Sequence, residues 1–128
     1  MIVADCTIIA RLIIGTGDVT GVESLWDHDP DWNAPALWEA EFASVLMKYE
    51  RAGVITPVAA ATFAARALQE LSEGTHHVSI DRAMDAARRS GCSVYDSYYI
   101  ALAEELGAKL YTYDREILRR CASLALEP

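Results

Sequence analysis

Residues 91–117, GCSVYDSYYIALAEELGAKLYTYDREI, constrain the fold more than any other stretch of the chain. Apolar and aromatic side chains lie on nearly every side of its YYIALA segment, so we expect a buried helix there. Gly107 stands where a glycine after a helix C-terminus belongs, and residues 109–113 have the threonine and aromatics of a short strand. Asp96 lies in the first turn of this helix, and Asp114 directly follows the strand. The stretch therefore predicts an α/β core with an acid at each change of element.

The rest of the chain alternates short apolar segments with helical patterns. Further strands are predicted at residues 1–5, 32–34, 76–80 and 124–126. Helices are predicted at residues 6–14, 18–26, 35–53, 56–72 and 81–90 and from Asp114 onward, with Asp18 and Asp81 as caps and Pro35 in a first turn. This alternation predicts a single α/β domain over residues 1–128, with a mostly parallel sheet of about four to five short strands. Right-handed crossovers would place helices on both faces of that sheet.

Composition limits the cellular setting. The chain has 128 residues, of which 52% are hydrophobic, enough for one domain with a real core. No apolar run reaches the ~18–20 residues that span a bilayer, and no signal peptide is recognisable, so we expect a cytoplasmic protein without a membrane segment. The three cysteines lack metal-site spacing, which indicates buried thiols in a reducing compartment.

The charge balance argues against a generic nucleic-acid-binding protein. The chain carries 19 acidic and 11 basic residues, for a net charge of −8, whereas such proteins normally present a basic face. The excess of acids fits a protein whose carboxylates cluster as metal ligands, or one that a basic partner covers. The charge alone does not distinguish these two cases.

Four acids are predicted to meet at one edge of the sheet. Ligands of open α/β sheets bind outside the carboxyl ends of the strands, and Asp5 and Asp114 each follow a strand. Asp96 begins the helix that leads into the second of these strands. Glu41 lies at the border of the apolar face of helix 35–53. We therefore expect these four carboxylates to lie close together.

Each acid also has an ordinary structural explanation. Asp5 and Asp114 could cap helices, Ser93 and Asp96 have the S-x-x-D spacing of a capping box, and Glu41 could be a surface residue. Carboxylates about 6 Å apart repel by ~2–3 kcal/mol per pair, and a hard divalent cation removes this repulsion. The shared location of the acids therefore favours a site for one or two Mg²⁺ or Mn²⁺ ions. Such a site supports hydrolysis of a phosphodiester.

The chain resembles the PIN domain family, specifically the VapC-type toxin ribonucleases of type II toxin–antitoxin pairs. Four stretches carry the resemblance, in the order of the family and over essentially the whole chain: IVADCTIIARL, APALWEAEFASVL, SVYDSYYIALAEELGAKL and YTYDREI. The resemblance implies that Asp5, Glu41, Asp96 and Asp114 are the catalytic metal ligands. It also implies that Thr7 and Thr112 hold a water or a carboxylate, and it places a further acid of some members near Glu116.

The resemblance implies an activity and partners as well. The expected activity is Mg²⁺- or Mn²⁺-dependent endonucleolytic cleavage of single-stranded or structured RNA, and the resemblance implies that cleavage of single-stranded RNA leaves a 3′ hydroxyl and a 5′ phosphate. The expected partners are a small antitoxin that covers the site and a second copy of the chain in a homodimer. The best candidates for RNA contact are four arginines that are also explicable as solvated helix charge: Arg11, Arg115, Arg119 and Arg120.

Two alternatives were weighed against this hypothesis. One is a non-catalytic RNA- or protein-binding module on the same fold. The other is a calcium loop at residues 27–31, which read DHDPD. An EF-hand needs Gly at its sixth place and Glu at its twelfth, where this chain has Trp32 and Trp38, so a solvated loop is favoured.

Overall fold

A computed structural model describes all residues from 1 to 128. Its centre is a five-stranded sheet in the order β3-β2-β1-β4-β5, and each pair of neighbouring strands is parallel. The strands are β1 (Ile2–Ala4), β2 (Trp32–Pro35), β3 (Thr75–His76), β4 (Leu110–Tyr111) and β5 (Ala125–Leu126). The predicted parallel α/β fold is confirmed.

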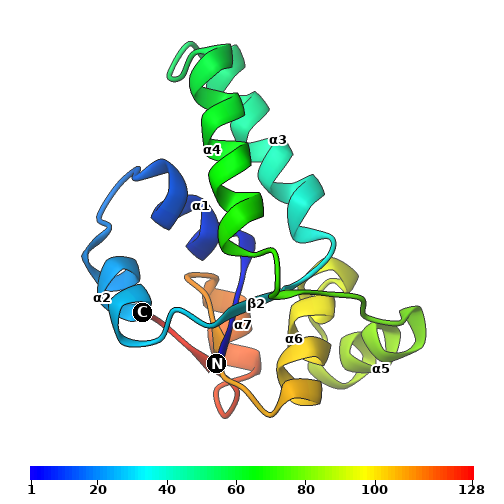
Figure 1. The fold of residues 1–128 in the computed structure, drawn as a ribbon. Coiled ribbons are helices and arrows are strands. Elements are labelled where there is room, and N and C mark those ends of the chain that lie inside the picture. Colours follow the sequence, from blue (N-terminus) through cyan, green and yellow to red (C-terminus); the bar gives the residue numbers. More distant parts are fainter.

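Seven helices connect these strands. They are α1 (Cys6–Ile14), α2 (Thr20–His28), α3 (Trp38–Arg51), α4 (Pro57–Glu70), α5 (Ile80–Ser90), α6 (Val94–Leu106) and α7 (Arg115–Arg120). The chain moves outward from β1 to β2 to β3 and then crosses back over β1 to β4. Because crossovers are right-handed, α1–α4 cover one face and α5–α7 the other, and α3 and α4 project from the body as a pair (Figure 1). No helix combines the length and the apolar character that a membrane crossing requires.

Helix α6 lies across the middle of the sheet, against β1, β2 and β4. Its side chains Ile100 and Leu102 are each 1% exposed, as the apolar pattern of the sequence predicts. Burying a side chain of this size stabilises the fold by about 1.5–3 kcal/mol. Gly107 ends the helix with φ of 63°, the left-handed conformation that glycine adopts without strain.

Several predicted boundaries are wrong, because tertiary pairing overrides the local signal. Pro35 belongs to β2, since the N–H of Ala36 donates to the carbonyl of His76, and α3 begins only at Trp38. Predicted strand 76–80 is shorter, because Ser79 caps α5 in place of the predicted Asp81.

The other boundary differences are smaller. Predicted strand 109–113 is reduced to β4, Leu110–Tyr111. Predicted helix 18–26 begins at Thr20, whose N–H donates to Oδ1 of Asp18 at 3.0 Å, so Asp18 stabilises a turn before the helix.

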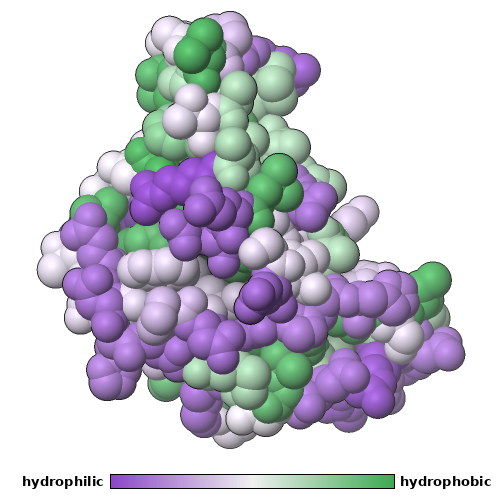
Figure 2. Space-filling model, in the orientation of Figure 1, coloured by the Kyte–Doolittle hydropathy of each residue, from purple (hydrophilic) through white to green (hydrophobic).

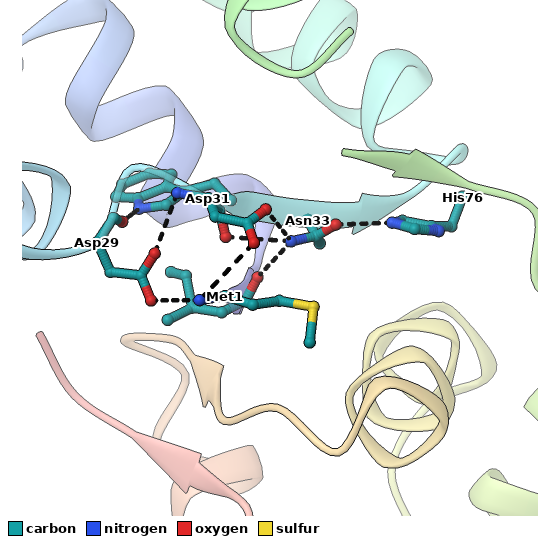
Figure 3. A network of polar contacts seen from close by, with 7 residues as sticks. Met1, Asp29, Asp31, Asn33 and His76 are labelled. Carbon is teal, nitrogen blue, oxygen red and sulfur yellow. Dashed lines mark hydrogen bonds and ion pairs between the residues drawn. The ribbon is translucent and has the colours of Figure 1, made fainter. Parts of the chain in front are cut away.

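A fully satisfied polar group joins three strands on one side of the sheet (Figure 3). The side-chain amide of Asn33, which is 4% exposed, donates to the carbonyl of Ile2 at 3.3 Å. Its oxygen lies 2.7 Å from Nε2 of His76, which must therefore donate. The α-amino group of Met1 forms an ion pair with Asp29, in the loop that sequence analysis interpreted as solvated. These contacts give His76 and Asp29 structural partners.

Candidate active site

Asp5 is the most enclosed of the four predicted acids. It follows β1, caps α1 and is only 7% exposed. Its Oδ1 accepts hydrogen bonds from the backbone N–H of Ile8 at 3.0 Å and from the hydroxyl of Thr7 at 2.6 Å. Its Oδ2 accepts a short hydrogen bond from the hydroxyl of Thr112. Three donors therefore hold this carboxylate in one orientation at the carboxyl end of the central strand.

Thr112 connects Asp5 to Asp114. Its side chain is fully buried, and its Oγ1 also accepts the N–H of Asp114 at 2.9 Å. Asp114 caps α7 through Oδ1, which accepts from the N–H groups of Glu116 at 2.9 Å and Ile117 at 3.0 Å. No protein group donates to its other oxygen, Oδ2. Asp114 thus caps a helix and keeps one carboxylate oxygen without a protein donor, while Thr112 links its backbone to Asp5.

Glu41 reaches the same edge of the sheet from α3. It is half-buried on α3, and its Oε1 accepts a hydrogen bond of 2.8 Å from the hydroxyl of Tyr99 on α6. Tyr99 is 2% exposed. The apolar pattern of the sequence predicts only a core position for Tyr99 and does not predict this contact. The available signal was its spacing, because Tyr99 lies three residues after Asp96 and therefore on the same side of α6.

Asp96 lies in the first turn of α6 and is half-buried. Its N–H donates to Oγ of Ser93 at 3.1 Å, so the capping interpretation of this S-x-x-D segment is correct for the local structure. This bond uses only the backbone N–H of Asp96. Burial raises the pKa of its carboxyl group, and the Ser93 side chain opposes that rise. A cap at this position is therefore compatible with a place for Asp96 in the site.

The electrostatics show that the acids act on one another. Burial raises the pKa of Asp5, and its three hydrogen bonds oppose that rise. Burial also raises the pKa of Glu41 and of Asp96, and in each case neighbouring carboxylates raise it further: Asp5 and Asp96 for Glu41, and Asp114, Asp5 and Glu116 for Asp96. Burial raises the pKa of the Cys6 thiol to about 12, and the charges of Glu41 and Asp5 contribute to this rise. The four predicted acids therefore form one electrostatically coupled group.

The donor set suits a hard divalent cation, because all four side chains offer carboxylate oxygens. As the side chains stand, no three of them surround a point at which one ion could be bound. Mg²⁺ is commonly held by one or two carboxylates and completed by water, and this edge can supply that arrangement. A cage of all four carboxylates around one ion is not formed, and the ligand set remains a prediction.

The remaining predicted residues lie on two helices, Arg11 on α1 and the others on α7. Glu116 is exposed, and its Oε1 pairs with Nε of Arg120 at 2.6 Å and with Arg119 at 3.6 Å. Both of these arginines are therefore paired within their own helix. Arg115 is exposed and has no carboxylate partner, and Arg11 lies over the ring of Tyr113.

Comparison with known proteins identifies the family. The PIN domain family model matches residues 2–123. Ribonuclease VapC3 of Pyrobaculum aerophilum is 28% identical over 130 residues, covering 96% of each chain. Ribonuclease VapC3 of Mycobacterium tuberculosis is 30% identical over 118 residues, covering 92% of this chain and 85% of that protein.

Solved structures share the fold. PAE2754 from Pyrobaculum aerophilum superposes with a TM-score of 0.75 at 22% identity, covering 96% of this chain and 81% of that one. FitAcB from Neisseria gonorrhoeae gives 0.71 at 16% identity, with coverage of 100% and 97%. A toxin–antitoxin complex from Klebsiella pneumoniae gives 0.63 at 14% identity, with coverage of 91% and 90%. From the family match and the VapC relatives, the chain belongs to the PIN domain family, as a member of its VapC type.

Proposed function

We propose that this protein is a divalent-metal-dependent endoribonuclease that acts as the toxin of a toxin–antitoxin pair. The observation that carries the proposal is the coupled group of four carboxylates at the carboxyl edge of a PIN sheet. Burial raises the pKa of Asp5, Glu41 and Asp96, and neighbouring carboxylates raise the pKa of Glu41 and Asp96 further, which is a cost to the fold that a cation would reduce. Two relatives that match nearly the whole chain are named ribonucleases.

The four acids differ in how firmly hydrogen bonds hold their side chains. Asp5 is fixed by three donors, and Asp114 is fixed through one oxygen while the other stays available. Glu41 is held by one hydroxyl, that of Tyr99. We assign Asp5 and Asp114 as the rigid part of a metal-binding site and Asp96 and Glu41 as side chains that adjust to the ion or to its waters. A divalent cation held there would supply Lewis acidity for phosphodiester hydrolysis.

We expect the few arginine side chains near the acids to contact the substrate. Arg115 follows Asp114 at the beginning of α7 and has no carboxylate partner. Arg119 and Arg120 are engaged by Glu116, so their phosphate contacts would require them to exchange that partner. In a chain with a net charge of −8, we expect modest affinity for RNA and a strong dependence on the metal.

The proposed protein partners are an antitoxin and a second copy of the chain. The similar structure from Klebsiella pneumoniae is a toxin–antitoxin complex. The projecting α3–α4 pair and the loop that joins its helices carry exposed apolar side chains, including Val54 at 60%, Val58 at 77% and Leu68 at 50% exposure. Apolar surface is visible there in Figure 2. Exposed apolar side chains on one pair of helices are typical of a surface that a partner covers.

The direct test is cleavage of unstructured RNA. We expect the wild type to cut in Mg²⁺ or Mn²⁺ and to stop in EDTA, and Asp96→Asn to be inactive. Asp81→Asn is the matched control, since Asp81 is an exposed acid in the first turn of α5 that forms no ion pair. Sequencing of RNA 5′ ends after induced expression of the wild type and of Asp96→Asn would then locate the cellular target. Equal inertness of wild type and variants on varied RNAs, transfer RNA included, would favour the non-catalytic binding module instead.

A further inference from the structure

Arg11 and Tyr113 form a stacked pair beside the acids. The guanidinium carbon of Arg11 lies 4.0 Å from the centroid of the Tyr113 ring. A guanidinium NH group of Arg11 also donates to the backbone carbonyl of Asp18 at 3.3 Å. Both side chains are half-buried, so they are fixed at the surface without being enclosed. Two contacts from different elements thus hold the planar cation over the aromatic ring.

The pair is positioned by the same segments that position the site. Tyr113 stands between Thr112, which donates to Asp5, and Asp114, which caps α7. Arg11 lies on α1, the helix that Asp5 caps. Six residues of helix rise by about 9 Å, so Arg11 lies about 9 Å along α1 from Asp5, while Tyr113 directly precedes Asp114.

The charge of Arg11 is not consumed by a carboxylate. Arg119 and Arg120 pair with Glu116, whereas the only polar partner of Arg11 is a backbone carbonyl. A cation that stacks on a ring keeps its charge available to a phosphate. Beside an acidic edge that repels RNA, such a cation is well placed to hold the strand.

We propose that Arg11 and Tyr113 form a stacking platform for one unpaired base of single-stranded RNA next to the scissile phosphate. The proposal rests on the function proposed above and adds to it a binding position for one base. Bases stack on aromatic rings and on guanidinium planes, and such stacking tolerates any base. A base within a duplex is already stacked and paired, so the platform favours single strands and sets which phosphate faces the acids.

The test compares cleavage of intact and abasic RNA. The probe is a short unstructured RNA that the wild type cuts at one position, with a single abasic site moved along its length. We expect Tyr113→Leu to lower kcat/KM on intact RNA by about 5- to 100-fold, the range for loss of one base stack. Tyr113→Phe keeps the ring and should cut as the wild type does. On RNA that is abasic at the stacked position, Tyr113→Leu should cause no further loss, which a merely structural defect would not reproduce.

Matched controls exclude general effects. Tyr111→Leu makes the same change two residues earlier, in β4, where the tyrosine lies against α2 and the C-terminal residues and has no stacked cation. Arg11→Gln should weaken cleavage in the same position-dependent way. Arg51→Gln removes an exposed, unpaired charge at the last residue of α3 and should not weaken it.

Two results would overturn the proposal in distinguishable ways. Suppose that the wild type cuts RNA and that Tyr113→Leu and Arg11→Gln each cut intact RNA and abasic RNA as well as the wild type does. The stacking platform alone is then refuted. If the folded wild type cuts no RNA in Mg²⁺ or Mn²⁺, the proposed function falls and the platform falls with it.

Discussion

Thr112→Val tests how the acidic edge is held together. The Thr112 side chain is fully buried, donates to Oδ2 of Asp5 and accepts the N–H of Asp114 at 2.9 Å. Valine has nearly the same shape but no hydroxyl. The substitution therefore removes one of three donors from a buried carboxylate and leaves one backbone N–H without its acceptor.

The expected loss follows from these two contacts. A hydrogen bond to a charged group contributes about 1.5–3 kcal/mol, and a neutral one about 0.5–1.5 kcal/mol. We therefore expect Thr112→Val to lower the free energy of unfolding by roughly 2–4 kcal/mol at neutral pH. Thr112→Ser is the control, because it keeps the hydroxyl and removes one methyl group, at a cost of about 1 kcal/mol.

The loss should depend on pH, with a defined sign. Burial raises the pKa of Asp5 in the folded protein, and the Thr112 hydrogen bond opposes that rise. The valine variant therefore has a still higher folded pKa. A carboxyl whose folded pKa lies above its unfolded value reduces stability as pH rises between the two. The difference between Thr112→Val and wild type should thus be largest at neutral pH and shrink as the pH falls toward the unfolded pKa of ~3.9.

Urea unfolding of wild type, Thr112→Val and Thr112→Ser at neutral pH and near pH 4.5 measures both quantities. The reasoning is refuted if valine costs no more than serine at neutral pH. It is also refuted if the extra loss in the valine variant has the same size at both pH values.

Three further predictions concern single contacts. Asp96→Asn should raise the stability of the metal-free protein by up to about 1 kcal/mol, since it removes screened repulsion with its neighbours, and a lower melting temperature than wild type would contradict this. Tyr99→Phe removes the donor to Glu41 and should lower the free energy of unfolding in urea by about 1–2 kcal/mol. An unchanged midpoint would show that this hydrogen bond does not stabilise the fold. Gly74→Ala should lower the free energy of unfolding by more than about 2 kcal/mol, because a Cβ would lie 2.0 Å from the carbonyl oxygen of Trp32. A melting temperature near that of the wild type would contradict this close approach.

Local sequence signals predict the order of helices and strands and the acids that follow the strands. Asp5 and Asp114 were predictable because each follows an apolar segment that had to be a parallel strand, and parallel strands end at one edge. The boundary at Pro35 was not predictable, since proline suits a first helical turn and only pairing with β3 keeps it in a strand.

Contacts between distant elements were also out of reach. The Glu41–Tyr99 bond joins residues 58 positions apart on α3 and α6, so it depends on how both helices pack on the sheet. The stacking of Arg11 on Tyr113 depends likewise on the position of α1 beside the end of β4. Side-chain type indicated which residues could act, whereas packing decided which of them meet.

Capping and metal binding were weighed as competing roles for these acids, but a carboxylate has two oxygens and can serve both. At Asp114, Oδ1 caps α7 and Oδ2 is left over, so two substitutions separate the roles. Asp114→Asn keeps a capping oxygen and should leave the metal-free melting temperature nearly unchanged, because asparagine caps as well as aspartate. Asp114→Ala loses the cap and should cost about 1 kcal/mol. Both should lose the rise in melting temperature that Mn²⁺ gives the wild type, because the anionic ligand is gone in each. A full Mn²⁺ response in Asp114→Asn would show that this carboxylate only caps the helix and that the ion, if bound, is held by the other acids.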